Sequence, residues 1–150
     1  MAAEKVAKIL LNIRNSGNKR FSSEIFKNLE LVKSYTKDNK HHLLFEFNVK
    51  DEFCNLHGSL HGGAISTLID CVTSVHVWAM DPKNRFVTST DLSSSFYLGV
   101  RPGQKLEITT QILSITENFA YTTALLSVNN DVVARGTQTL FFLNRTWSGP

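Results

Sequence analysis

The sequence predicts an α+β fold in which a mainly antiparallel sheet packs around one long helix. The helix is expected from His61 to Met80, because apolar residues recur there at helical spacing and no proline interrupts them. Two strand-like stretches precede this helix and four follow it, with turn residues between them. A chain of 150 residues with 42% hydrophobic content matches one domain, which we expect to span residues 1–150.

The first expected element is an N-terminal helix over about residues 3–15. Val6, Ile9, Leu10 and Ile13 are spaced as one face of a helix that could pack on the domain. The stretch Met1–Arg20 is also rich in lysine and arginine, as a mitochondrial presequence is. Both interpretations stay open, and we expect a cytoplasmic or mitochondrial protein.

The core of the domain is expected over about residues 29–143, and it begins with a β-hairpin. Apolar and polar residues alternate from Leu43 to Val49, which is the clearest strand pattern in the chain. Leu29–Tyr35 is its predicted partner strand, because the polar residues Lys37–Lys40 can form the turn between them.

Four further strands are predicted after the long helix. Pro82 ends the helix, and turn residues separate the strands that follow. We expect these strands near Phe86–Leu98, Lys105–Ile115, Phe119–Val128 and Val132–Leu143. Residues 144–150, which include Trp147, are expected to form a loosely ordered tail.

Composition argues against several classes of protein. The apolar runs are too short to span a bilayer, so no membrane insertion is expected. A net charge of +3 from scattered basic residues does not indicate nucleic-acid binding. Two cysteines are too few for a disulfide framework. Cys54, His57, His61 and Cys71 match no paired metal-ligand motif, so we expect no metal, and Cys71 is expected to be a core residue.

Two adjacent glycines open the long helix. Gly62 and Gly63 leave backbone N–H groups accessible at a helix N-terminus, where donors lack intrahelical partners. Such donors can stabilise the oxyanion that forms when a carbonyl group is attacked. Tight packing of the helix is the alternative reason for a glycine pair.

Asp70 is the candidate catalytic carboxylate. Ser66, Thr73 and Ser74 lie one helical turn away from it, so a polar stripe runs along a mostly apolar helix. A carboxylate is costly in such a place unless it is used, although a solvent-facing Asp is the simpler alternative. It could act as a general base for water or as a nucleophile that forms a mixed anhydride.

The stretch Asn55–Ala64, running into the helix that carries Asp70, resembles the signature of the hotdog-fold acyl-coenzyme A thioesterases. The resemblance is to the branch of the thioesterase superfamily that contains phenylacetate-pathway enzymes and small mammalian acyl-coenzyme A thioesterases. It extends from about Leu29 to about Leu143. It implies a hotdog fold and hydrolysis of fatty-acyl or aryl-acyl coenzyme A to the free acid and coenzyme A. Coenzyme A is then part of the substrate, and no separate cofactor is expected.

The same resemblance implies roles for individual residues. The Gly62 N–H would donate to the thioester carbonyl with help from Asn55, His61 would lie near the leaving thiolate, and Ser89 would hold the attacking water. Substrate-binding positions implied in the same way are Gly63, Thr88, Phe96, Ser114, Thr116 and Asn118. Some relatives have lysine and glycine in the turn at residues 114–118, where this chain has Glu117, which would repel phosphate.

The resemblance also implies a homodimer with shared active sites, and further pairing into a tetramer. Two alternative functions stay open, a non-catalytic binder of acyl thioesters and a hotdog hydratase of enoyl thioesters. The usual Asp and His pair of the hydratases is not evident in the sequence. The acyl group, and the choice between coenzyme A and acyl carrier protein, are not specified by the sequence.

Overall fold

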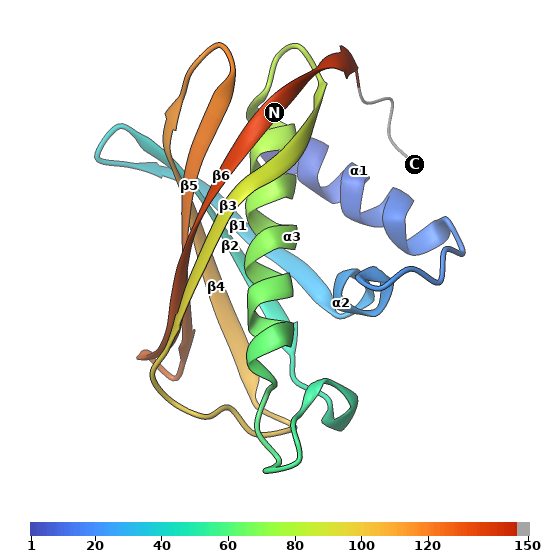
Figure 1. The fold of residues 1–150 in the computed structure, drawn as a ribbon, viewed down its shortest axis with the longest axis vertical. Coiled ribbons are helices and arrows are strands. Elements are labelled where there is room, and N and C mark those ends of the chain that lie inside the picture. The colour runs from blue at the N-terminus through green and yellow to red at the C-terminus, as the bar shows by residue number, and fades with distance from the viewer. Residues whose placement is uncertain (147–150) are drawn as a thin grey trace.

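A computed structural model describes residues 1–146 of the chain. The long helix α3 (Gly62–Met80) packs against one face of a six-stranded antiparallel sheet with the order β1-β2-β4-β5-β6-β3 (Figure 1). The strands are β1 (Leu29–Lys37), β2 (Lys40–Asn48), β3 (Arg85–Phe96), β4 (Lys105–Ile115), β5 (Phe119–Val128) and β6 (Asp131–Thr146). This is the predicted hotdog arrangement.

Two hairpin turns consist of residues that tolerate a left-handed backbone. Asp38 and Asn39 join β1 to β2 with φ angles of 49° and 57°, and Asn129 and Asn130 join β5 to β6 with φ angles of 51° and 71°. Two successive residues with positive φ form the turn that best matches the twist of a hairpin. The polar residues between the strands therefore set the register of these two pairs.

Burial follows the strand period and places the core between the sheet and α3. On β4, Leu106, Ile108, Thr110 and Ile112 are buried, and the residues between them are more exposed. Leu68, Ile69 and Val72 of α3 are fully buried against this face. By length and composition α3 could also cross a membrane, but 56% of its apolar window is buried inside the domain, as in the core helix of a globular protein.

Helix α1 (Ala2–Asn15) lies beside α3, on the side away from β5 and β6 (Figure 1). Its apolar residues Val6, Ile9 and Leu10 are buried in the main core. The N-terminal stretch therefore packs on the domain, which was one of the two interpretations of its sequence. Cellular location stays a prediction.

Two short helices were not predicted, α2 (Ser23–Lys27) and the 3-10 helix η1 (Asp51–Phe53). With 5 and 3 residues they are too short to show a helical repeat in the sequence. Ser23, Ile25 and Phe26 of α2 are nevertheless buried. The Arg14 side chain ties α1 to this segment through the carbonyl groups of Phe26 and Leu29.

The predicted loosely ordered tail is wrong for residues 144–146. Strand β6 continues to Thr146, which pairs with Arg85 at the start of β3. The partner strand offers backbone hydrogen bonds at this point, so the chain stays extended although its side chains are polar. Trp147 lies outside the described residues.

Candidate active site

His61 caps the N-terminus of α3. Its backbone is extended (φ −63°, ψ 136°), and its Nδ1 accepts a hydrogen bond from the Gly63 N–H at 2.8 Å. A neutral His61 ring with an accepting Nδ1 carries its proton on Nε2, so its outer nitrogen is a donor. Among residues 1–146 the Gly62 N–H has no acceptor, and neither has the Ala64 N–H, so the Gly62 N–H is one of the donors of this helix start that are left for a ligand.

Asn55 lies in a tight hairpin that leads back to this cap. The Asn55 N–H donates to the Ser59 carbonyl at 2.8 Å, and the His61 N–H donates to the Phe53 carbonyl at 2.9 Å. The Asn55 side-chain oxygen accepts from the N–H groups of His57 at 2.9 Å and Ser59 at 3.2 Å. Its oxygen therefore shapes the loop, and its side-chain NH2 is the part that can donate to a substrate.

Each glycine at the helix start has one aromatic ring beside it. A Cβ on Gly62 would lie 3.5 Å from the ring of Phe96, which is itself 52% exposed. A Cβ on Gly63 would lie 3.1 Å from His61 Nδ1, so glycine at this position leaves room for the capping ring. The structure thus brings together four of the predicted residues, His61, Gly62, Gly63 and Phe96.

Asp70, in the middle of α3, is held by side chains from two strands. Its Oδ1 accepts from Ser89 Oγ of β3 at 2.9 Å and from Gln138 Nε2 of β6. Gln138 Nε2 also donates to Ser89 Oγ at 2.7 Å, and Thr73 Oγ1 binds the Gln138 oxygen. The carboxylate is half-buried, and its second oxygen has no partner in the described chain. That oxygen can accept a hydrogen bond from a water molecule.

A β-bulge orients Ser89. Ser89 pairs with Leu140 and Asp91 pairs with Thr139, so Thr90 is the extra residue on β3. Ser89 consequently shares the helix-facing side of the sheet with Leu140 and Gln138, and its hydroxyl meets Asp70. Bulges often redirect a side chain beside a functional site. Thr88, the residue before Ser89, points to the other face of the strand.

Sequence reasoning missed Gln138. It falls in the buried row of β6, which otherwise consists of small or apolar residues, Ala134, Gly136, Leu140 and Phe142. Gln138 is only 1% exposed. A single amide in such a row needs buried hydrogen-bond partners, and this was the available signal.

The predicted site residues do not all come together within one chain. Gly62 and Asp70 are eight positions apart on α3, which is about 12 Å along the helix axis. The turn between β4 and β5 lies at the other end of α3 from Gly62 (Figure 1). There Arg85, just after α3, donates to the Glu117 carbonyl at 2.7 Å.

The predicted substrate-binding residues of this turn lie far from the helix start. Ser114, Thr116 and Asn118 are exposed. The Thr116 hydroxyl closes the turn by accepting from the Phe119 N–H at 3.0 Å. The backbone carbonyl of Asn118 accepts a hydrogen bond from the Phe142 N–H at 2.8 Å.

Within residues 1–146, no group of three or more His, Cys, Asp or Glu side chains is placed so that it could hold a metal ion. Cys71, which follows Asp70, is buried, and this burial raises the pKa of its thiol. A thiol that stays protonated is a poor nucleophile. Cys71 therefore belongs to the core.

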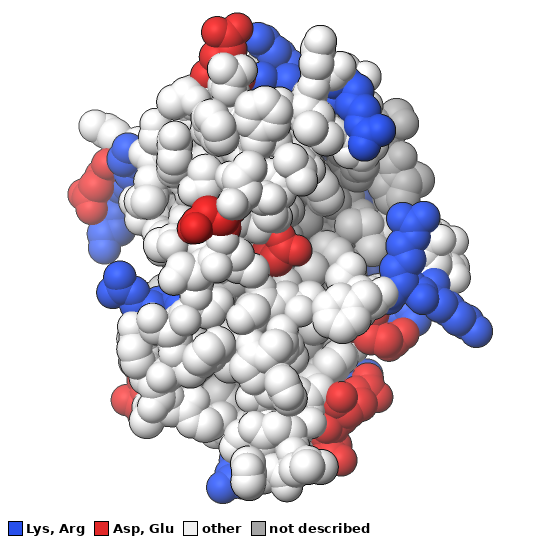
Figure 2. All heavy atoms as spheres, viewed as in Figure 1, with Lys and Arg blue, Asp and Glu red and all other residues white. Residues whose placement is uncertain are grey.

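The face of the molecule formed by α3 and the neighbouring strands carries few charged side chains. Figure 2 shows acidic groups near the centre of this face and most basic groups at its rim. Large apolar side chains of β3 and the loop after it are exposed, with fractions of 40% for Leu92, 51% for Tyr97 and 54% for Leu98. Residues 85–96 also form an edge of the sheet.

Comparison with known proteins gives a family match and a set of similar folds. The model of the Thioesterase superfamily matches residues 57–134. The Caenorhabditis elegans protein F42H10.6, whose name describes it as a candidate esterase, is 34% identical over 106 residues, which is 69% of this chain. The chain spans 62% of the length of that relative.

Solved structures of similar fold include proteins from a fish and two bacteria. Zebra fish thioesterase superfamily member 2 has a TM-score of 0.80 at 20% identity, covering 93% of this chain and 97% of that one. The Escherichia coli PaaI protein of the phenylacetic acid degradation operon gives 0.76 at 13% identity, with 97% and 99% covered. The smu.793 protein of Streptococcus mutans UA159, solved with acetyl CoA, gives 0.70 at 20% identity, with 87% and 100% covered.

Proposed function

The chain belongs to the thioesterase superfamily, and from that premise we propose that it hydrolyses acyl-coenzyme A thioesters to a free acid and coenzyme A. The observation that carries the proposal is the half-buried Asp70, held at one oxygen by Ser89 and Gln138 with its other oxygen free. A positioned carboxylate with one free oxygen suits the activation of water. The acetyl CoA bound by the similarly folded Streptococcus mutans protein supports coenzyme A as the carrier.

The chemistry divides between two groups of residues. The free Gly62 N–H and the Asn55 side-chain NH2 would donate to the thioester oxygen and stabilise the oxyanion. Asp70 would take a proton from the attacking water, which the Ser89 hydroxyl helps to hold. The outer nitrogen of His61, a donor, would lie near the sulfur and assist the departing thiolate.

The general-base route fits this geometry better than attack by Asp70 itself. Oδ1 is engaged by two donors, which favours a fixed carboxylate over one that must rotate to bond the acyl carbon. A single turnover in H2¹⁸O tests for an anhydride that water opens at the carboxyl carbon of Asp70. The base route puts ¹⁸O into the released acid, whereas ¹⁸O in the peptide that contains Asp70 would establish the anhydride route.

A complete site requires a second copy of the chain. The oxyanion of a thioester lies within a few ångströms of the attacked carbon, whereas Gly62 and Asp70 are separated by about 12 Å along α3. We therefore propose that Asn55, His61 and Gly62 of one subunit face Asp70 and Ser89 of its partner. Pairing of dimers into a tetramer and a cytoplasmic or mitochondrial location are expectations that rest on the resemblance alone.

Strand β3 is the surface that suits this dimer. It is an edge strand of 12 residues, and its unpaired backbone groups can pair with another strand. The exposed apolar side chains of Leu92, Phe96 and Tyr97 add area that a partner would cover. A two-fold axis would use the same surface on both subunits.

The hydratase alternative fits less well. Within residues 1–146 the side-chain partners of Asp70 are Ser89 and Gln138, and no histidine is among them. A hydratase that pairs Asp with His would need such a contact.

The direct test is to incubate purified protein with short, medium, long and aromatic acyl-coenzyme A esters and to trap the free thiol with a chromogenic reagent. Thiol release that depends on Asp70 supports the hydrolase and ranks its substrates. Binding of these esters without thiol release would establish a non-catalytic binder instead. Repeating the assay with acyl carrier protein thioesters distinguishes the two carriers.

A further inference from the structure

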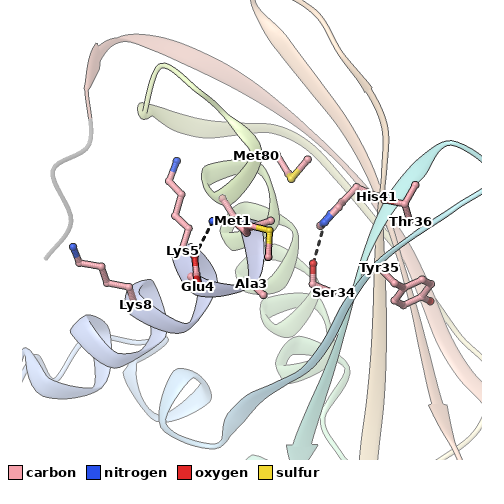
Figure 3. A pocket seen from close by; sticks show the side chains of 12 residues that line it. Met1, Ala3, Glu4, Lys5, Lys8, Ser34, Tyr35, Thr36, His41 and Met80 are labelled. Atoms are coloured by element: carbon pink, nitrogen blue, oxygen red, sulfur yellow. Dashed lines mark hydrogen bonds and ion pairs between the residues drawn. The ribbon is translucent and has the colours of Figure 1, made fainter.

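A hydrogen-bonded chain of four polar side chains, separate from the contacts of Asp70, crosses the domain near the C-terminal end of α3. Ser34 Oγ of β1 lies 3.0 Å from His41 Nε2 of β2 (Figure 3). His41 Nδ1 lies 2.8 Å from His76 Nε2 of α3, and His76 Nδ1 lies 2.8 Å from Thr110 Oγ1 of β4. The residues assigned to thioester hydrolysis take no part in these contacts.

One order of protons along the chain makes His41 a base, and it starts at the buried end. With Thr110 Oγ1 donating to the Leu43 carbonyl, 3.4 Å away, Thr110 Oγ1 accepts from the Nδ1–H of His76. His76 Nε2 is then an acceptor for the Nδ1–H of His41. His41 Nε2 is in turn an acceptor, and the Ser34 hydroxyl donates to it.

This order of groups is that of an activated nucleophile. A hydroxyl faces an imidazole base, and a third group on the far side orients the base. His76 is fully buried and held on both nitrogens, so it fixes the ring of His41. Burial lowers the pKa of His76 to about 3, with further lowering by His41 and His42, and burial together with His42 lowers the pKa of His41. Both rings are therefore neutral near pH 7.

Ser34 and His41 are accessible from outside. They line an open cavity of about 900 Å³ whose other walls include Tyr35, Ala79, Met80 and the first turn of α1. Figure 3 shows the Ser34 and His41 side chains directed toward each other at one side of this cavity. The lining includes the apolar residues Met1, Ala3, Ala79 and Met80, and Lys5 and Lys8 lie on the α1 side.

We propose that Ser34, His41 and His76 form a second nucleophilic site, which takes small carboxylic esters with an apolar acyl group. Ser34 Oγ attacks the ester carbonyl while its proton passes to His41 Nε2. The leaving alcohol takes that proton as the carbon–oxygen bond breaks, and an acyl-serine remains. Water then attacks the acyl-serine, gives a proton to His41, and releases the acid as the proton returns to Ser34.

The site is tested in the Asp70→Asn protein, so that the proposed thioesterase chemistry is removed. The probes are p-nitrophenyl butyrate and an alkyl fluorophosphonate, which phosphonylates an activated serine and releases fluoride. We expect ester hydrolysis above buffer and a single phosphonyl group that peptide mapping places on Ser34. Ser34→Ala and His41→Gln should each lower both rates by about 100-fold or more. Ser127→Ala, which removes a half-buried serine hydroxyl of β5 outside this cavity, should leave them unchanged.

The result that overturns the proposal is equally direct. Failure of the probe to modify Ser34, or modification that persists at the same rate in His41→Gln, shows that the three side chains only stabilise the fold. Ser34→Ala removes one half-buried oxygen at the sheet edge, so it tests the nucleophile even if His41→Gln does not fold. Its thermal midpoint is measured alongside. Loss of thioesterase activity in Asp70→Asn with normal labelling of Ser34 separates the two sites.

Discussion

At the scale of single residues, Asp70 differs from an ordinary surface aspartate in its fixed contacts. Its Oδ1 accepts hydrogen bonds from Ser89 and Gln138, which belong to neighbouring strands. Gln138 is in turn fixed by Thr73 one turn further along α3. A carboxylate oriented by a buried amide loses little freedom when a water molecule binds its second oxygen.

Replacing Asp70 by asparagine tests this role. The change keeps the shape of the side chain but removes the base, so turnover should fall by roughly 10²–10⁴-fold. Binding of a non-hydrolysable acyl-coenzyme A thioether should survive, as measured by calorimetry. Asp131→Asn, at the exposed start of β6, is the matched control. Near-normal turnover in Asp70→Asn would exclude both proposed roles of the carboxylate.

The Gly62 N–H can be removed with little risk to the fold. Gly62 is the first residue of α3, where proline is well tolerated, and the extended His61 before it has the conformation that precedes a proline. Gly62→Pro should therefore keep its thermal midpoint and lose about 10²–10³-fold in turnover.

Gly62→Ala adds side-chain bulk but keeps the N–H donor, so it separates the effect of crowding from the loss of the donor. The added Cβ makes only an ordinary 3.5 Å contact with Phe96, and the N–H remains. Its loss should be smaller than that of the proline variant and should fall mainly on turnover, because the methyl group crowds the substrate. Full activity in a folded Gly62→Pro protein would refute the oxyanion role.

The buried His76 gives a pH dependence to stability. Its pKa is about 3 in the folded protein, against 6.5 as the ordinary value, so the unfolded chain binds more protons between these limits. Its contribution to the free energy of unfolding is therefore full above pH 6.5 and is lost as the pH falls. At pH 5 the expected loss is about 2 kcal/mol.

Denaturant unfolding at pH 7.5 and pH 5.0 measures this loss. The lowered pKa of Asp81 changes the free energy of unfolding only below about pH 3.8, the ordinary pKa of the group, so it does not contribute between pH 5.0 and 7.5. His57→Gln, at an exposed loop, should keep the wild-type dependence, and His76→Gln should reduce it to the part that comes from the lowered pKa of His41. Equal stability of the wild type at the two pH values would show that the histidine pair titrates normally.

At the scale of elements, the site depends on how closely α3 approaches β6. A Cβ on Gly136 would lie 2.7 Å from Ile69 Cδ1 and 2.7 Å from the Ser93 carbonyl oxygen. Such distances are far inside van der Waals contact, so only glycine allows this spacing. Ile69 precedes Asp70, and Gly136 precedes Gln138 by two residues on the same face. The glycine therefore sets the distance between the carboxylate and its amide partner.

Gly136→Ala should consequently lower both stability and turnover. Overpacking of this kind costs about 1–3 kcal/mol, and the displaced helix would weaken the contact between Asp70 and Gln138. Chemical denaturation and thiol release measure the two effects. Gly62→Ala, the same substitution with ordinary contacts, should be nearly neutral in stability. An unchanged unfolding midpoint in Gly136→Ala would mean that the sheet can shift at no cost.

The elements that the sequence predicted are those with several repeats of a burial pattern. Helix α3 was expected at residues 61–80 and occupies Gly62–Met80, and β4 and β5 match their predicted bounds. The short helices α2 and η1 contain fewer residues than such a pattern needs.

The candidate site was less accessible to sequence reasoning than the fold. The contact between Asp70 and Ser89 depends on the register of β3 and on its bulge at Thr90, which are set by long-range pairing. The roles of Asn55, Gly62, His61 and Ser89 came from the resemblance and stay predictions. Gln138 carried a local signal, a polar residue in a buried row, and the histidine chain had none because its members are distant in the sequence.

At the scale of the whole molecule, the two groups of residues that we propose for thioester hydrolysis lie in separate places on one subunit. The helix start with Gly62 and the mid-helix Asp70 share one straight element, so no rearrangement of side chains can bring them to one carbonyl group. The exposed edge of β3 lies beside both parts, with the Phe96 ring near Gly62 and Ser89 at Asp70. A partner that pairs with this edge is the simplest way to complete the site.

Mixed dimers of two inactive variants test this assembly. Asn55→Ala loses the donor side of the site and keeps Asp70, whereas Asp70→Asn keeps the donor side. In a mixed dimer one site combines both defects. The other site receives an intact donor side from the Asp70→Asn chain and an intact Asp70 from its partner, so it should work. Because random pairing of equal amounts makes about half of the dimers mixed, each with one good site of two, co-refolding should restore about a quarter of wild-type activity.

The control for this experiment is the same two variants refolded separately and then mixed under conditions in which subunits do not exchange. Sedimentation must show dimers or larger assemblies in both samples. Pairing of dimers into tetramers leaves the expected quarter unchanged, provided that each site spans a single dimer interface. Loss of the dimer on replacing Leu92 with arginine, at the exposed edge of β3, would identify that interface. Dimers whose activity after co-refolding does not exceed the control would mean that each chain holds a whole site, and the 12 Å between Gly62 and Asp70 would then have to be bridged by a change in α3 itself.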